Sequence, residues 1–103
     1  MIKVFAKDIE DKKVFKRAGY DYYQVYADRD NHIYIYEMEL DGIHKGYEVI
    51  KAIRHKNPDG RIIYKYPNDE QFGLYGWYIS GPLRVEMEKI PEKVLTLKKR
   101  GNG

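Results

Sequence analysis

The chain has 103 residues, of which 43% are hydrophobic and 34% are charged, so it suits one folded domain with a modest core. It has no cysteine, which excludes disulfide scaffolds, thiolate metal sites and cysteine nucleophiles. The net charge is only +3, and no apolar run approaches the roughly 20 residues that cross a bilayer. The first residues do not resemble a signal peptide, so we expect a cytoplasmic protein that does not enter a membrane.

The first 20 residues permit two interpretations. Residues 2–7 favour a strand, whereas Val14, Phe15 and Ala18 are compatible with a short helix that Gly19 ends. Local pattern alone leaves helix and strand open for residues 2–18.

The middle of the chain predicts an antiparallel meander. Runs rich in tyrosine and β-branched residues alternate with strong turn signals. A two-residue loop at Asp41-Gly42 favours a type I′ turn, and residues 57–60 have the composition of a type I turn with a glycine bulge. The predicted strands are residues 20–27, 32–40, 47–56 and 61–66.

The two tight turns also predict the register and therefore the faces of the sheet. They predict the pairs Leu40 with Ile43, Tyr36 with Tyr47, Tyr34 with Val49, His55 with Ile63 and Arg54 with Tyr64. The core side is then expected to carry Tyr34, Tyr36, Met38, Leu40, Ile43, Tyr47, Val49, Ile53 and Ile63. The opposite face is expected to be mixed, with Ile33, Ile35, Glu37, Glu39, Glu48, Ile50, Arg54, Lys56, Ile62, Tyr64 and Tyr66.

Short helices are predicted in the C-terminal third. Asn68 and Gln71 form a capping-box pattern at the start of a helix that extends toward Ile79. Residues 83–90 favour a second helix, although they also alternate as a strand does. Pro91 is expected to break or restart that helix.

These elements predict an α+β fold. We expect a four- to five-stranded antiparallel β-meander, its fifth strand coming from the N-terminus, with short helices from the C-terminal third on one face. Residues 1–97 are expected to form a single compact domain, and residues 98–103 a basic flexible tail.

Catalytic and metal-binding patterns are weak. Ser80 and Thr96 are the only hydroxyl nucleophiles apart from tyrosine, and Ser80 lies in a Gly-Pro turn without a nearby histidine in sequence. In the predicted register the three histidines lie too far apart to share a metal ion. A metal-free ribonuclease is a minor possibility, but the long helices ahead of the sheet that are typical of small basic toxins are not evident. We therefore expect no catalytic residues, cofactor or metal.

A basic, tyrosine-containing hairpin at residues 51–66 is the sharpest candidate site. Basic side chains attract phosphates, and aromatic rings stack on unpaired nucleobases, so this composition suits single-stranded RNA or DNA. If Glu37, Glu39 and Glu48 pair with these bases across the sheet, the hairpin is instead an ordinary charged face. Its candidate binding residues are Lys51, Arg54, Lys56, Arg61, Tyr64, Lys65 and Tyr66.

An aromatic patch is the second candidate site. Protein interfaces favour tryptophan and tyrosine as buried anchors, but a predicted helix that packs on the sheet gives the same pattern. Together with the exposed tyrosines of an uncovered sheet, the patch predicts a small non-enzymatic module that binds another protein or a second copy of itself. Such a module fits an accessory or inhibitory factor of bacterial or mobile-element origin, and nucleic-acid binding is the alternative. The patch residues are Phe72, Leu74, Tyr75, Trp77 and Tyr78.

Overall fold

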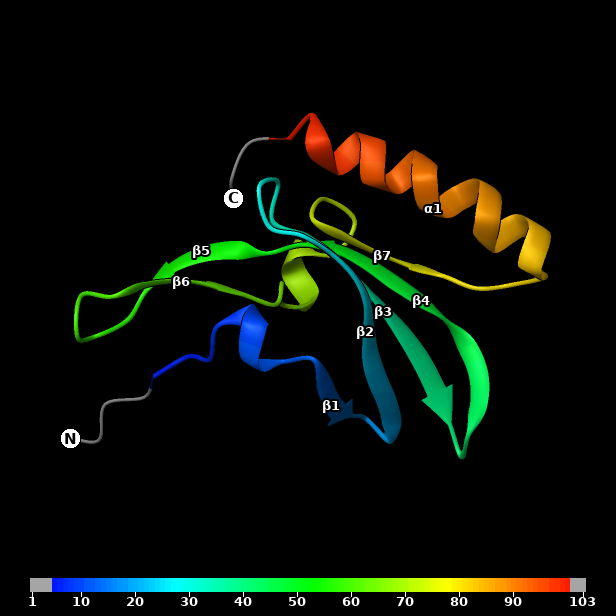
Figure 1. The fold of residues 1–103 in the computed structure, drawn as a ribbon, viewed down its shortest axis with the longest axis horizontal. Helices are drawn as coiled ribbons and strands as arrows, with labels where there is room; N and C mark the ends of the chain where they lie inside the picture. Colours follow the sequence, from blue (N-terminus) through cyan, green and yellow to red (C-terminus); the bar gives the residue numbers. More distant parts are fainter. Residues whose placement is uncertain (1–4, 101–103) are drawn as a thin grey trace.

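The computed structural model describes residues 5–100, and these form an α+β fold (Figure 1). A five-stranded antiparallel sheet has the strand order β1-β2-β3-β4-β7, and β5 and β6 form a separate two-stranded ribbon. The predicted fold class is therefore confirmed. In chain order the elements are η1 (Ile9–Asp11), β1 (Val14–Arg17), β2 (Tyr20–Asp28), β3 (Ile33–Leu40), β4 (Ile43–Lys51), β5 (Ile53–Lys56), β6 (Ile62–Lys65), η2 (Asp69–Gln71), β7 (Gly76–Ile79) and α1 (Leu83–Lys98).

Residues 14–17 form a strand, where the sequence was compatible with either a helix or a strand. Val14–Arg17 pairs with the start of β2 through a tight turn at Ala18 and Gly19. Both turn residues have positive φ angles, 53° and 85°, which is the type I′ pattern that matches the twist of a hairpin. Residues 5–7 have no regular structure, and the rest of the predicted strand at residues 2–7 lies outside the described residues.

The turn between β3 and β4 follows the prediction. Asp41 and Gly42 have φ angles of 53° and 79°, as a type I′ turn requires, and Leu40 pairs with Ile43. A bulge at Gly46 then shifts the register. Beyond it the predicted pairs are wrong by one residue, because an extra residue on β4 separates the turn from the ladder. Tyr36 faces Glu48 instead of Tyr47, and Tyr34 faces Ile50 instead of Val49.

The predicted fourth strand of the meander does not lie in the main sheet. The run at residues 47–56 is interrupted at Ala52, whose backbone N–H donates to the carbonyl of His32. Residues 53–56 pair only with residues 62–65, in the predicted register of His55 with Ile63. The strand that pairs with β4 on the side away from β3 is β7, which the sequence analysis predicted as part of a helix.

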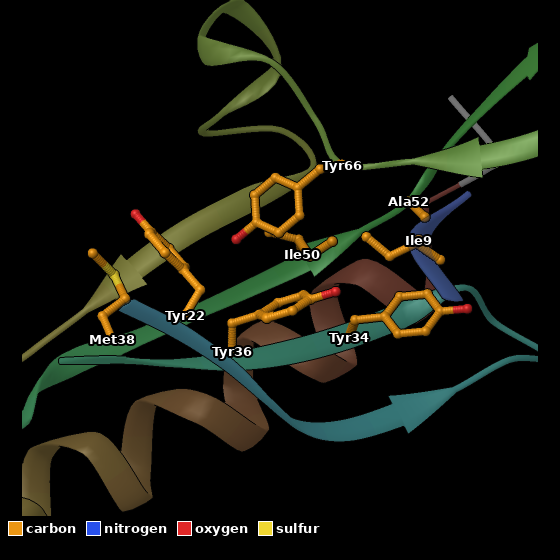
Figure 2. Close-up of a cluster of buried hydrophobic side chains, with 8 residues drawn as sticks. All are labelled: Ile9, Tyr22, Tyr34, Tyr36, Met38, Ile50, Ala52 and Tyr66. Carbon is orange, nitrogen blue, oxygen red and sulfur yellow. The ribbon is translucent and has the colours of Figure 1, made fainter. Parts of the chain in front are cut away.

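Both faces of the main sheet are partly covered. We call the side beneath α1 the helix face; its buried cluster consists of Ile33, Ile35, Val49, Ile79 and Leu97. We call the other side the aromatic face; its buried cluster consists of Ile9, Tyr22, Tyr34, Tyr36, Met38, Ile50, Ala52 and Tyr66 (Figure 2). The predicted core residues Tyr34, Tyr36 and Met38 are buried as expected. Ile33 and Ile35 lie on the opposite side as predicted, where α1 covers them. The predicted faces of β4 are wrong: Val49 lies on the helix face and Ile50 on the aromatic face, because the bulge shifts the register.

The C-terminal third contains one long helix among the described residues. The capping box of Asn68 and Gln71 is present, but it starts only η2, and the predicted helix at residues 68–79 is wrong. Gly76 explains the difference: a Cβ there would lie 3.1 Å from the Ile50 side chain, so this residue packs closely as part of a strand. The predicted helix at residues 83–90 is confirmed, but it continues through Pro91 to Lys98. The expected tail therefore begins inside α1, and residues 101–103 lie outside the described residues.

Candidate functional site

Lys51 lies outside the basic surface that the sequence predicted. The residue is 3% exposed, and its Nζ donates to the carbonyl of Leu97 at 3.2 Å and to that of Arg100 at 2.8 Å. Burial lowers the pKa of this ammonium group. A positive charge against the last carbonyls of a helix is favourable, so Lys51 caps α1 and fixes it to β4.

Tyr66 is likewise buried. It points from the end of β6 into the aromatic cluster (Figure 2), and its hydroxyl donates to Glu48. Arg17 donates to both carboxylate oxygens of Glu48 at 3.0 Å and to the hydroxyl of Tyr22 at 3.0 Å. Burial and Glu48 raise the pKa of Tyr66, so it remains a donor. Tyr66 is thus unable to stack on a nucleobase, and Glu48 is engaged by Arg17.

The other bases of the hairpin lie on the ribbon of β5 and β6, which we call the basic arm. Arg54, Lys56 and Arg61 are exposed, and Lys65 is half-buried. Arg61 lies 3.7 Å from Asp59, and within residues 5–100 the remaining three bases form no ion pair. Glu37, Glu39 and Glu48, the acids that the sequence left as possible partners, do not pair with these bases, because the arm leaves the sheet that carries the acids.

Tyr64 shares a face of the basic arm with Arg54, and its half-buried ring packs against the aromatic cluster. The ring of His32 is stacked on it, with centroids 3.8 Å apart and planes inclined by 12°. One face of Tyr64 is therefore occupied from within the protein. A single-strand-binding platform of Tyr64 and Tyr66 is not formed, because one ring is stacked and the other is buried.

The aromatic patch around Trp77 is divided between the two faces of β7. Trp77 lies beneath α1, where Lys93 and Arg100 approach its ring at 4.8 and 5.9 Å. Tyr78 points to the opposite side, and its hydroxyl donates to the carbonyl of Lys45 at 2.7 Å. Tyr75 precedes the strand, and its carbonyl accepts from the backbone of Lys51. These residues do not form one continuous anchor.

An apolar groove beside α1 is a site that the sequence analysis missed. It has a volume of about 430 Å³ and lies between the helix and strands β2 and β3. The available signal was the spacing of Met87, Pro91 and Leu95 by four residues, which places a second apolar stripe beside the buried one of Ile90 and Val94. The groove is lined by Tyr26, Ile35, Ile90, Pro91, Val94, Leu95 and Lys98.

The groove continues onto an uncovered part of the helix face. The helix packs on β3, β4 and β7. On the β1 and β2 side, Val14 pairs with Tyr23 and Tyr23 pairs with Glu37, so these side chains share the face of Ile35. Val14 is 66% exposed and Tyr23 is 36% exposed. The sheet therefore presents apolar side chains that nothing in the described residues covers.

The two ends of this surface differ in charge. Lys98 lines the groove near Asp28, at the C-terminal end of β2, and it helps to lower the pKa of that carboxyl, after the hydrogen bond from Asn31. Asp21 pairs with Glu39 near the other end of β2. Desolvation, and then the hydrogen bond to and repulsion from Glu37, raise the pKa of Glu39. One end therefore carries Lys98 beside Asp28, and the other carries the acidic group of Asp21, Glu37 and Glu39.

Comparison with known proteins gives no relative: no family model, curated protein or solved structure matches the chain. Within residues 5–100, no helix is long and apolar enough to span a membrane, and no group of histidine and acidic side chains is arranged to hold a metal ion.

Proposed function

We propose that the protein is a small, non-enzymatic protein-binding module whose apolar groove accepts an amphipathic helix of another protein. The observation that carries the proposal is the exposure of large apolar side chains on both walls: Leu95 is 55% exposed and Tyr26 is 40% exposed. A folded protein that leaves such a surface in contact with water gains free energy when a partner covers it.

The dimensions of the sheet support a helix as the occupant. Five strands at about 4.8 Å spacing measure roughly 19 Å between the outer strands, whereas a helix with its side chains is about 10 Å wide. One helix therefore covers about half of the helix face. A second helix beside α1 fills the remaining width and places its apolar stripe against Tyr23, Tyr26 and Leu95.

The charges at the two ends of the groove set the direction in which the partner helix docks. An acidic side chain at one end of the docked helix meets Lys98, and a basic side chain at the other end relieves the repulsion among Asp21, Glu37 and Glu39. The proposed partner is thus a helix with an apolar stripe, an acid near one end and a base near the other.

The test uses peptides selected for binding from a displayed library of amphipathic helices. We expect a selected peptide to bind with its contacts at Tyr26, Ile35 and Leu95, as mapped by backbone NMR shifts. Leu95→Glu should weaken binding at least tenfold. Leu74→Glu is the matched control, because Leu74 is 53% exposed and lies outside the groove, and it should leave the affinity unchanged.

Three results contradict the proposal. One is that no helical peptide is selected, and another is that Leu74→Glu weakens binding as much as Leu95→Glu does. The third is a dimer of the chain in light scattering that Leu95→Glu converts to a monomer, because a second copy then occupies the groove.

A further inference from the structure

We propose that the basic arm is a second binding site, independent of the groove, which places its open face in the major groove of double-stranded DNA. The arm projects from one end of the sheet as a separate antiparallel ribbon (Figure 1). It carries Arg54, Lys56, Arg61 and Lys65, with Asp59 as its only acid.

The two faces of the arm differ in accessibility. Paired residues share a face, so Arg54 with Tyr64 and Lys56 with Ile62 define one face, and all four side chains are at least partly exposed. The other face contains the buried residues Ile53 and Ile63. The accessible face is therefore the one that carries Arg54 and Lys56.

The N-terminal segment braces the arm. The Asn57 side chain accepts from the backbone N–H of Ala6 at 3.0 Å and donates to its carbonyl at 3.2 Å. Asp8 accepts from the backbone N–H of Tyr64 at 3.1 Å. These bonds hold the ribbon in place before a ligand arrives, which lowers the entropy lost on binding.

Duplex DNA fits the arm better than a single strand does. A single-strand site needs free aromatic faces for stacking, and here Tyr66 is buried and Tyr64 is stacked on His32. A two-stranded ribbon fits the B-DNA major groove, which is about 12 Å wide, whereas the major groove of duplex RNA is narrow and deep. Arg54 and Lys56 then enter the groove close to its phosphates, and Arg61 approaches phosphates from the exposed turn, whereas Lys65 lies on the other face with Ile53.

The positive charge of the region extends beyond the ribbon. Desolvation and the nearby charges of Arg17, Lys7 and Lys65 lower the pKa of Lys12. Several basic side chains therefore lie where the arm joins the rest of the protein. Asp8 lies near these side chains, bonded to the Tyr64 amide, so the exposed bases of the arm carry most of the attraction for a polyanion, and binding should depend on salt.

The test measures fluorescence anisotropy with three probes of equal length: a labelled 16-base-pair DNA duplex of mixed sequence, one of its single strands, and the RNA duplex. We expect the DNA duplex to bind most tightly. If Arg54, Lys56 and Arg61 neutralise three phosphates, the slope of log K against log salt is about −2.7, so the affinity should fall roughly 40-fold between 50 and 200 mM salt.

The Arg54→Gln/Lys56→Gln variant should bind the DNA duplex at least tenfold more weakly and reduce the slope by about 2. The matched control is Arg84→Gln/Lys89→Gln, which removes the same two charges from exposed positions of α1 and should keep most of the affinity. Leu95→Glu should also retain DNA binding, so failure of the groove and failure of the arm are distinguishable.

Three outcomes overturn the inference. They are no binding to the duplex at 50 mM salt, equal or tighter binding of the single strand, and equal losses in the arm variant and the α1 control. Because Arg54 and Lys56 are exposed, their replacement should leave the circular dichroism spectrum unchanged. Arg61→Gln, which changes an exposed residue of the turn, provides a second variant with a smaller expected loss.

Discussion

At the scale of single residues, the hydroxyl of Tyr66 makes a buried hydrogen bond whose removal should lower the free energy of unfolding, although only one atom is lost. Tyr66→Phe keeps the ring in the aromatic cluster but leaves the buried Glu48 carboxylate without this donor. We expect a loss of about 1–3 kcal/mol in urea unfolding. Tyr78→Phe removes an exposed hydroxyl bonded to the Lys45 carbonyl and should change stability by less than about 0.5 kcal/mol. Equal effects of the two variants would show that the bond from Tyr66 to Glu48 contributes no more stability than an exposed one.

His44 links the β3–β4 hairpin to the first turns of α1. Its Nδ1 lies 2.8 Å from Glu37 and its Nε2 lies 3.0 Å from Glu86. The bond to Glu86 and that to Glu37 raise the pKa of His44, whereas burial and Lys51 lower the pKa of His32. An NMR titration should therefore find His44 titrating above, and His32 below, the ordinary value of about 6.5. The reverse order would contradict these contacts.

The sign of the stability effect follows from the raised pKa of His44. The folded state binds this proton more tightly than the unfolded chain does, so the contribution is present below about pH 6.5 and is lost as the pH rises through the folded pKa. The contribution should be below about 1 kcal/mol, because the side chain is 37% exposed. In urea unfolding, His44→Gln should cost more at pH 6 than at pH 8.

At the scale of secondary-structure elements, local signals predicted turns and strands, but not their long-range pairing. Asp41-Gly42 defines a type I′ turn because both positions need positive φ, and this is legible in the sequence. The bulge at Gly46 is not legible, because it depends on how β7 approaches β4. The prediction that Pro91 ends or restarts the helix failed for a similar reason. Ile90 and Leu97 pack against the sheet, and this packing stabilises the helix beyond Pro91.

Gly46 tests that explanation. A Cβ at this position would lie 2.6 Å from the Ile79 carbonyl oxygen and 2.8 Å from the Tyr78 ring. Gly46→Ala must push β7 away from β4, so we expect a loss of about 1–3 kcal/mol. Urea unfolding gives the measurement, and the exposed neighbour Lys45→Ala is the control, with a change within about 0.5 kcal/mol. If Gly46→Ala is as stable as the control, β7 does not approach β4 this closely.

At the scale of the whole molecule, the candidate sites could be predicted only in part because they depend on which strands meet. The sequence shows that residues 51–66 are basic. The accessible face of the arm exists because the arm separates from the main sheet. Lys51 and Tyr66 have the same local composition around them, yet tertiary contacts bury both. The groove needs α1 to lie across strands more than 40 residues earlier in the chain, which no local pattern specifies.

The same architecture predicts where the fold opens first. Strands β3 and β4 pair on both edges and carry buried residues on both faces, whereas β5 and β6 pair only with each other. Amide hydrogen exchange reports the free energy of such local opening. We expect amides of Ile35 and Val49 to exchange at least 100-fold more slowly than those of His55 and Ile63, which pair across the arm. Uniform protection would mean that the arm unfolds only with the core, and it would then meet DNA as a rigid extension of the sheet.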